Sequence, residues 1–156
     1  MLGIVENGVY VGNIGLHDLK RPNRSGMIGY WLAEAHQGKG IMTDCARAMT
    51  EYGFAELGLN RIYIHCAAGN AKSRAIPERL GYVQEGVLQD AEHLYGMLHD
   101  LIVYGITHNG WEALKDIAYY KSLPAVFDGF IDVPDLYDGV IRLICTEKHP
   151  ANPEKN

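Results

Sequence analysis

The sequence predicts an α/β (α+β) fold in which a mixed, mostly antiparallel sheet is flanked by helices. Near the N-terminus, apolar runs surround Asn7-Gly8, the strongest short signal for a β-hairpin. From Ile41 the apolar residues recur at helical spacing, and strand-like and helix-like segments then alternate. A chain of 156 residues, 47% of them hydrophobic, is long enough to bury the core of one such domain.

Three antiparallel strands come first. They are predicted over Leu2 to Glu6, Val9 to Leu16 and Met27 to Leu32, with the polar turn DLKRPNRSG between the second and the third. A helix of about four turns follows, because a set of apolar residues falls on one helical face and Gly58 is placed to end it. The members of this set are Ile41, Cys45, Ala48, Met49, Tyr52 and Ala55.

The next segment is a strand followed by a short helix. Asn60 to Ala67 is rich in β-branched and aromatic residues, as a buried strand is. Asn70 stands where an N-cap belongs and Gly81 where a C-terminal glycine belongs. Pro77 lies inside this helix and has no amide proton, so the carbonyl of Ser73 is expected to lack its helical partner.

Two more strands are predicted, over Val83 to Leu88 and Met97 to Ile106. The last third is punctuated by proline and aspartate, with one helix candidate, Trp111 to Lys121, and one strand candidate, Val140 to Cys145. We therefore divide the chain into a domain of residues 1–108 and a C-terminal extension of residues 109–156.

Composition and cysteine usage exclude several classes of function. The net charge of −5 argues against nucleic acid or an anionic membrane surface as a partner. Cys45, Cys66 and Cys145 are odd in number and form no CxxC pair, so neither a disulfide framework nor a metal site is expected. The N-terminus lacks the features of a signal peptide, and we expect a cytoplasmic protein.

A glycine-rich turn, HQGKGIM, stands between the third strand and the long helix. Such a junction can present free amides and the positive end of the helix dipole to a phosphate group. The pattern is neither GxxxxGK[ST] nor GxGxxG, so the NTP-binding and dinucleotide-binding signatures are not met. Taken alone, it fits either an ordinary loop or an anion site.

Residues 2 to about 107 resemble the Gcn5-related N-acetyltransferases (GNAT), and within them the RimJ/RimL branch that acetylates N-terminal amines of proteins, including ribosomal proteins. The resemblance is carried by GYWLAEAHQGKGIMT, GLNRIYIHCAAGNAKSRAIPERLGY and EGVLQDAEHLYGMLHDLIVYGI. It implies that the turn amides hold the pyrophosphate of acetyl-coenzyme A. These residues are Gln37, Gly38, Lys39, Gly40, Ile41 and Met42; the methionine departs from the wider superfamily but suits this branch.

The resemblance also implies the catalytic residues of a direct transfer to an amine. Glu92 matches the glutamate thought to act as base, directly or through water, with Glu85 as the substitute; Glu92 also fits a solvated residue in a loop. Ser73 matches the residue placed near the sulfur, although it also fits the N-terminal turn of its helix. Asn70 is implied to contact the pantetheine arm, and as an N-cap it would be present in any case.

An oxyanion donor is expected from the backbone of Trp31 to Ala33, where two strands of the family's sheet part. Trp31 and Leu32 are therefore included among the coenzyme-binding residues. The Tyr30 and Trp31 side chains fit either the wall of an acetyl pocket or the core.

Two histidines stand next to a cysteine or an aspartate in predicted strands. His65 and Cys66 fit core packing better than catalysis. His99 and Asp100 are neighbours in a strand and point to opposite sides, which argues against a joint role.

A complete GNAT domain begins with a further strand and usually two helices, which have no counterpart before Leu2. This leaves an exposed sheet edge, and we expect the segment GVIRLIC or a second subunit to cover it. A chain that is only a fragment is the alternative. The incomplete groove keeps two other functions open, a coenzyme A-binding module without turnover and an oligomerisation module.

Overall fold

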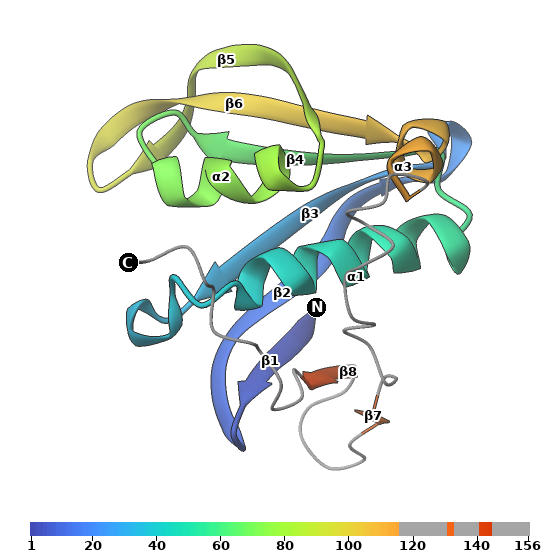
Figure 1. Ribbon diagram of the computed structural model, residues 1–156. Coiled ribbons are helices and arrows are strands. Elements are labelled where there is room, and N and C mark those ends of the chain that lie inside the picture. The colour runs from blue at the N-terminus through green and yellow to red at the C-terminus, as the bar shows by residue number, and fades with distance from the viewer. Residues whose placement is uncertain (116–130, 133–140, 145–156) are drawn as a thin grey trace, which may run out of the picture.

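The computed structural model describes residues 1–115, 131–132 and 141–144 and arranges their strands in one sheet (Figure 1). The strand order across this eight-stranded sheet is β5-β6-β4-β3-β2-β1-β8-β7. The strands are β1 Leu2–Glu6, β2 Val9–Lys20, β3 Ser25–Leu32, β4 Arg61–Ala67, β5 Val83–Leu94, β6 Met97–Thr107, β7 Ile131–Asp132 and β8 Ile141–Ile144. The predicted mixed, mostly antiparallel sheet is confirmed.

The pair β3 and β4 is parallel and lies between antiparallel neighbours. Its ladder is short, running only from the pair Ser25 and Arg61 to the pair Met27 and Tyr63. Both strands continue past this point, β3 to Leu32 and β4 to Ala67, without pairing to each other. A gap between two central strands therefore opens in the sheet.

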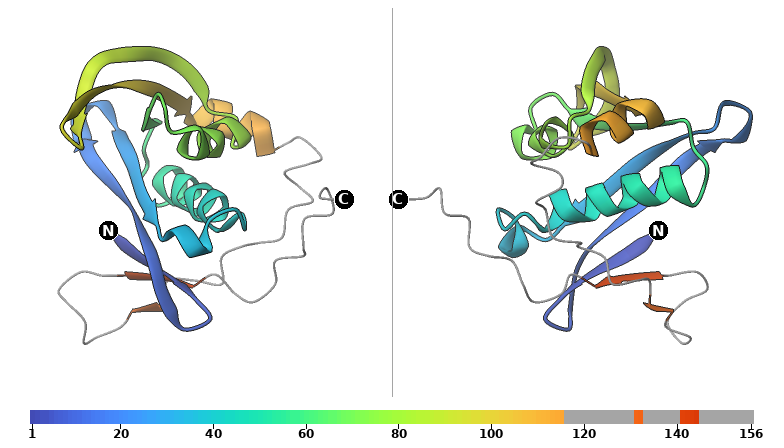
Figure 2. Two further views of the ribbon diagram at one scale, coloured as in Figure 1. Left: turned by 90° about the vertical axis from the view of Figure 1, so that its left-hand side faces the viewer. Right: turned by 45° about the vertical axis from the view of Figure 1, so that its right-hand side comes forward.

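Three helices cover one face of the sheet. They are α1 Ile41–Ala55, α2 Ala71–Arg79 and α3 His108–Lys115. Figure 2 shows α1 and α2 side by side on this helix face, whereas the opposite face, which we call the open face, carries no helix of the described residues. The core lies under the helices and includes Ile28, Ile64 and Met49. No described helix has the length and apolar character needed to cross a membrane.

Helix α2 forms as the sequence predicts. The Asn70 side chain accepts a hydrogen bond from the backbone amide of Ser73, 3.0 Å away, which caps the helix. Gly81 follows the helix with φ of 75°, a left-handed conformation that favours glycine. The carbonyl of Ser73, left free by Pro77, accepts a hydrogen bond from the Tyr30 hydroxyl at 3.0 Å. Tyr30 belongs to β3, so this bond ties the helix to the sheet.

Two strands extend beyond their predicted ends. Strand β2 continues to Lys20 through an irregularity at which Asp18 has φ of 46°. Strand β5 continues to Leu94 past a second irregularity, in which the backbone amide of Asp90 donates to the carboxylate of Asp100 at 2.9 Å. Glu92 therefore lies in a strand, and the interpretation of Glu92 as a loop residue is wrong.

Strand β8 pairs with β1 in parallel, matching Leu2 with Ile141 and Val5 with Ile144. The described part of the segment GVIRLIC, Ile141–Ile144, therefore lies along the first strand as predicted. The second subunit suggested for the same edge stays a prediction. Trp111 of α3 is 1% exposed and belongs to the core, although the predicted domain boundary precedes it. Residues 116–121 of the predicted helix, with Val140 and Cys145, lie outside the described residues.

Candidate functional site

The glycine turn projects open amides at the start of α1. Gly38 and Gly40 have φ of 77° and 85°, which reverses the chain between β3 and the helix. Among the described residues, no acceptor bonds the amides of Gly38, Lys39, Gly40, Ile41 or Met42. The amide of Gln37 differs, because it donates to the carbonyl of Glu34 at 3.1 Å. Five of the six amides predicted to bind an anion are therefore available.

Two lysines lie at the turn: Lys39, which the sequence predicts there, and Lys72, which was not predicted. The Lys39 ammonium is 3.2 Å from both carboxylate oxygens of Glu6, whose carboxylate also contacts His36. The hydrogen bond from His36 is the main cause that lowers the pKa of Glu6. Lys72, in the first turn of α2, donates to the side-chain oxygen of Gln37 at 3.1 Å. Its position two residues after the Asn70 cap was the signal that could have identified it.

The gap beside the turn offers one backbone donor in the stretch expected to hold an oxyanion. The amide of Ala33 is bonded to the carbonyl of Val11 at 2.8 Å, so Ala33 is excluded as a donor. Backbone amides point alternately to the two neighbouring strands. The amide of Trp31 therefore also points to β2, whereas the amide of Leu32 points toward β4. No described residue pairs with this Leu32 amide. The expected Trp31–Ala33 donor is thereby reduced to Leu32.

On the helix face, three polar side chains meet at the gap. The Ser73 hydroxyl is 3.3 Å from the Cys66 sulfur and 3.3 Å from the Tyr30 oxygen. Burial raises the pKa of Tyr30 and that of Cys66, so both groups stay protonated at neutral pH. The helix-capping bond uses the Ser73 backbone amide. The cap therefore does not use the hydroxyl, which donates to Tyr30 or Cys66 instead.

Tyr30 and Trp31 lie on opposite faces of β3. The Tyr30 side chain is half-buried and packs against the core, with its hydroxyl beside Ser73. Trp31 is 53% exposed, and its ring stacks on Tyr10 with the ring centroids 6.4 Å apart. The core interpretation is therefore wrong for Trp31, and an acetyl pocket walled by either side chain stays a prediction.

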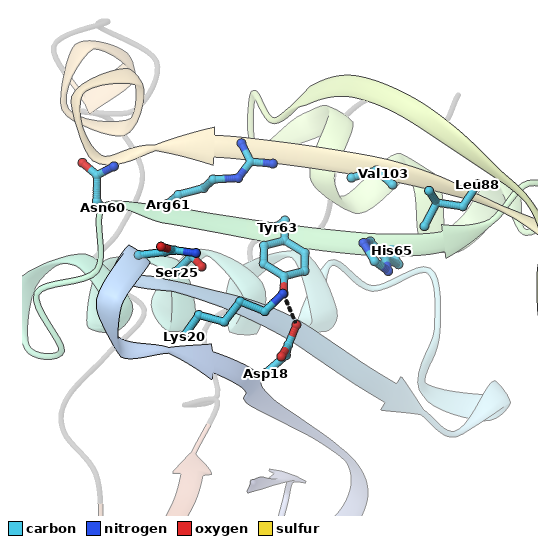
Figure 3. Close-up of a pocket in the computed structure, with 10 residues that line it drawn as sticks. Asp18, Lys20, Ser25, Asn60, Arg61, Tyr63, His65, Leu88 and Val103 are labelled. Carbon is cyan, nitrogen blue, oxygen red and sulfur yellow. Dashed lines mark hydrogen bonds and ion pairs between the residues drawn. The ribbon is translucent and has the colours of Figure 1, made fainter.

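A pocket of about 470 Å³ lies on the open face (Figure 3). The Tyr63 hydroxyl donates to the Asp18 carboxylate, and the Lys20 ammonium lies 3.1 Å from the same carboxylate. Burial, then the bond to Asp18, raise the pKa of Tyr63 to about 12. The residues lining the pocket are Asp18, Lys20, Asn23, Ser25, Asn60, Arg61, Tyr63, His65, Leu88 and Val103.

His65 and Cys66 alternate as predicted, but only Cys66 is a core residue. Cys66 is 2% exposed, whereas His65 is half-buried and lines the pocket. Burial lowers the pKa of His65, and the nearby Asp18 and Glu92 carboxylates act in the opposite direction. The prediction of core packing for His65 is wrong, because the inward face of β4 is taken by Cys66 and its alternate neighbours.

Glu92 is half-buried, and its strand position pairs with His99 of β6. The substitute, Glu85, is already engaged, since its two carboxylate oxygens bond the two terminal nitrogens of the Arg61 guanidinium. That bond lowers the pKa of Glu85 and favours its charged form. Glu92 is therefore the better placed of the two for proton transfer. In the described part of the chain, no group of three or more acidic, histidine or cysteine side chains could hold a metal ion.

Comparisons with known proteins agree with this geometry. The profile of the acetyltransferase (GNAT) domain family matches residues 2–83. One relative is YdaF of Bacillus subtilis, whose name describes a proposed ribosomal N-acetyltransferase. The two chains are 45% identical over 113 residues, and the match covers 72% of this chain and 62% of YdaF.

Two solved structures are similar in fold. One is a crystal structure of a probable acetyltransferase, with a TM-score of 0.66 and 46% identity, covering 67% of this chain and 60% of that chain. The other is the spermidine/spermine N-acetyltransferase of Vibrio cholerae in mutant forms, with a TM-score of 0.66 and 27% identity, covering 70% and 63%. The chain thus spans about three fifths of the length of the proteins it matches.

Proposed function

The chain belongs to the GNAT acetyltransferase family, and we propose that it moves an acetyl group from acetyl-coenzyme A to a primary amine. The acceptor we propose is the N-terminal α-amine of a protein or peptide, and the transfer is direct, within a ternary complex. The proposal includes a cytoplasmic location, where this coenzyme is available.

The observation that carries the proposal is the set of open amides from Gly38 to Met42. They stand at the N-terminus of a 15-residue helix, where the helix dipole favours an anion. A Cβ atom built on Gly38 would meet nothing within 4 Å, so the space directly beside this glycine is open. Lys72 adds a positive charge next to this space.

The gap between β3 and β4 supplies the chemistry of the transfer. A thioester arm lying in the gap would have the Leu32 amide to bind the oxyanion and the Ser73 hydroxyl to bond the leaving sulfur. Asn70 caps α2, the helix that carries Ser73, and in this proposal it contacts the pantetheine arm. Glu92 on the open face serves the deprotonation of the amine, directly or through an intermediary.

The α-amine is favoured over other amines by its acidity. An α-amine with a pKa of about 7.8 is about 10% neutral at pH 7, whereas a lysine amine with a pKa of about 10.4 is neutral to only about 0.04%. One modest base suits the first acceptor better than the second. The proposed name of YdaF agrees with this choice.

The test combines isothermal titration with acetyl-coenzyme A and a thiol-release assay on a panel of amines. The proposal expects binding together with release on peptides that have a free N-terminus. Release on spermidine alone would instead assign a polyamine acceptor, the substrate named for the Vibrio cholerae enzyme. Binding without release on any amine would identify a coenzyme-binding module. Self-association without binding would identify an oligomerisation module.

A further inference from the structure

None of the predicted coenzyme-binding residues lines the pocket on the open face, and His65 is the pocket residue nearest the gap. Building on the proposed function, we propose that His65 is a catalytic residue that takes the first proton from the acceptor amine. In this arrangement Glu92 is the carboxylate that stabilises the imidazolium so formed. The pocket is then the entry by which the amine reaches the thioester.

The position of His65 follows from the strand ladder. Pairing between β3 and β4 ends at Tyr63, and His65 is the next residue whose side chain points to the open face. Cys66, the neighbouring residue, points to the helix face and lies 3.3 Å from the Ser73 hydroxyl. A thioester in the gap would therefore have His65 on one side and Ser73 on the other. Figure 3 shows His65 at the gap, with Tyr63 nearer the start of the same strand.

The charges that act on His65 are those of Asp18 and Lys20 of β2 and Glu92 of β5. Two titratable rings also lie on this face: Tyr63 of β4 and His17 of β2, whose ring lies over Gly29 of β3. The Tyr63 and His65 rings lie 5.4 Å apart, and the Tyr63 hydroxyl is bonded to Asp18. The remaining walls near His65 are apolar, formed by Leu88 of β5 and Val103 of β6.

This environment suits a group that starts neutral and becomes charged. Burial lowers the pKa of His65, so the imidazole is neutral at pH 7 and can accept a proton. Asp18 and Glu92 raise the same pKa, which means that they favour the charged form once the proton has arrived. Asp18 is held in place with φ of 46°, an uncommon backbone conformation outside glycine, by its bond to Tyr63.

An imidazole is also a better first acceptor than a carboxylate. The ordinary pKa values are about 7.8 for an α-ammonium, about 6.5 for an imidazole and about 4.3 for a glutamate carboxylate. Proton transfer from the ammonium is therefore less unfavourable to a histidine than to a glutamate. Transfer to His65 therefore has a smaller free-energy cost than transfer to Glu92, and Glu92 keeps its negative charge to stabilise the imidazolium.

The proposed step is balanced as follows. The ammonium gives one proton to a ring nitrogen of His65 and becomes a neutral amine. The nitrogen of this neutral amine then bonds the thioester carbon, and the carbon–sulfur bond breaks. A second proton of the amine passes to the departing thiolate. The products are an amide, the free thiol of coenzyme A and one proton, which leaves His65 for solvent.

The main test is the pH profile of kcat/KM for a peptide acceptor in wild type and in His65→Gln. The wild type should lose activity as the pH falls through the His65 pKa, giving an acidic limb. His65→Gln should bind acetyl-coenzyme A normally by titration, have kcat/KM about 100-fold lower, and lack this limb. Added imidazole should restore part of the rate. The matched control is His93→Gln, since His93 is exposed and its side chain points away from the open face.

A second variant decides the matter if His65→Gln does not fold. Asp18→Asn keeps the imidazole but removes a carboxylate that raises its pKa, so the acidic limb should move to lower pH. An unchanged limb in Asp18→Asn, or full rate with an intact limb in His65→Gln, overturns the role of His65 and leaves the proposed function standing. No thiol release by wild type on any amine overturns both.

Discussion

The two faces of the sheet differ most at the gap between β3 and β4. On the helix face, Tyr30, Cys66 and Ser73 form a largely buried cluster whose hydroxyl and thiol groups stay neutral. On the open face, Asp18 and Tyr63 line a polar pocket reached from solvent. A single strand separates the two environments, because its side chains alternate. In the proposed function, the coenzyme can therefore bind on one face of this strand while the amine is deprotonated on the other.

The largest effect that would sharpen this comparison is expected at the glycine turn on the helix side. Gly40→Val should raise the Kd for acetyl-coenzyme A at least ~100-fold, or about 2.7 kcal/mol, because a β-branched residue does not adopt φ of 85° and would displace the open amides. Isothermal titration measures this loss.

Gly58→Val is its matched control. Gly58 has φ of 61° beyond the other end of α1, and a Cβ there would meet nothing within 4 Å. The two variants share the same kind of backbone strain, but only Gly40→Val should lose coenzyme affinity. Equal losses in both would show that strain, and not displacement of the turn amides, is the cause.

The open face is tested next, by Glu92→Gln. We expect normal coenzyme binding and a decrease in kcat/KM of about 100-fold on peptide α-amines. The variant loses the negative charge that, in the proposed mechanism, assists deprotonation of the amine. Steady-state kinetics with a coupled thiol assay measure the decrease. Glu85→Gln, which removes a carboxylate engaged with Arg61, should leave the rate nearly unchanged. Normal turnover of Glu92→Gln would remove this carboxylate from the mechanism.

A smaller effect separates the two interpretations of Ser73 on the helix face. Ser73→Ala keeps the backbone amide that bonds Asn70, so the melting temperature should change little. It loses the hydroxyl beside the gap, and kcat should fall about 10-fold while coenzyme affinity is retained. Thermal melting and kinetics on the same sample distinguish the roles. A lower melting temperature with unchanged kcat would leave Ser73 only a helix-terminal role.

The smallest effect concerns stability on the helix side and not catalysis. Burial raises the pKa of Glu51, but the bonds from Trp111 and Lys115 outweigh it, so the net pKa is lowered in the folded state. This contribution is therefore present above the unfolded-state pKa and is lost as the pH falls through the folded-state value. Glu51→Gln should lower the melting temperature by about 2–4 °C at pH 7 and by less at pH 4.

The control for Glu51→Gln is Glu56→Gln. Glu56 is exposed at the end of the same helix, and its substitution should change the melting temperature little at either pH. Scanning calorimetry at pH 7 and pH 4 measures both variants. A deficit for Glu51→Gln that is the same at the two pH values would contradict a role for the Glu51 charge in holding α3 on α1.

Local chemistry explains which features could be predicted. Asn70 caps α2 and Pro77 frees the Ser73 carbonyl because these effects involve residues only a few positions apart. The strand assignment of Glu92 was missed, since it depends on an irregularity in β5 and on pairing with β6. The partner of the freed carbonyl, Tyr30, is 43 positions away and could not be read from the helix itself.

The order of strands and helices from β1 to α3, the glycine turn ahead of α1 and the alternation of His65 with Cys66 follow from the sequence alone, because each depends on neighbours along the chain. Strand β7 was not predicted. Only the tertiary structure decided which of those two side chains enters the core, which backbone amide faces the gap and which carboxylate stays free of an arginine. The physical reason is that burial and pairing are set by which strands adjoin, and β4 meets β3 and β6 from distant parts of the chain.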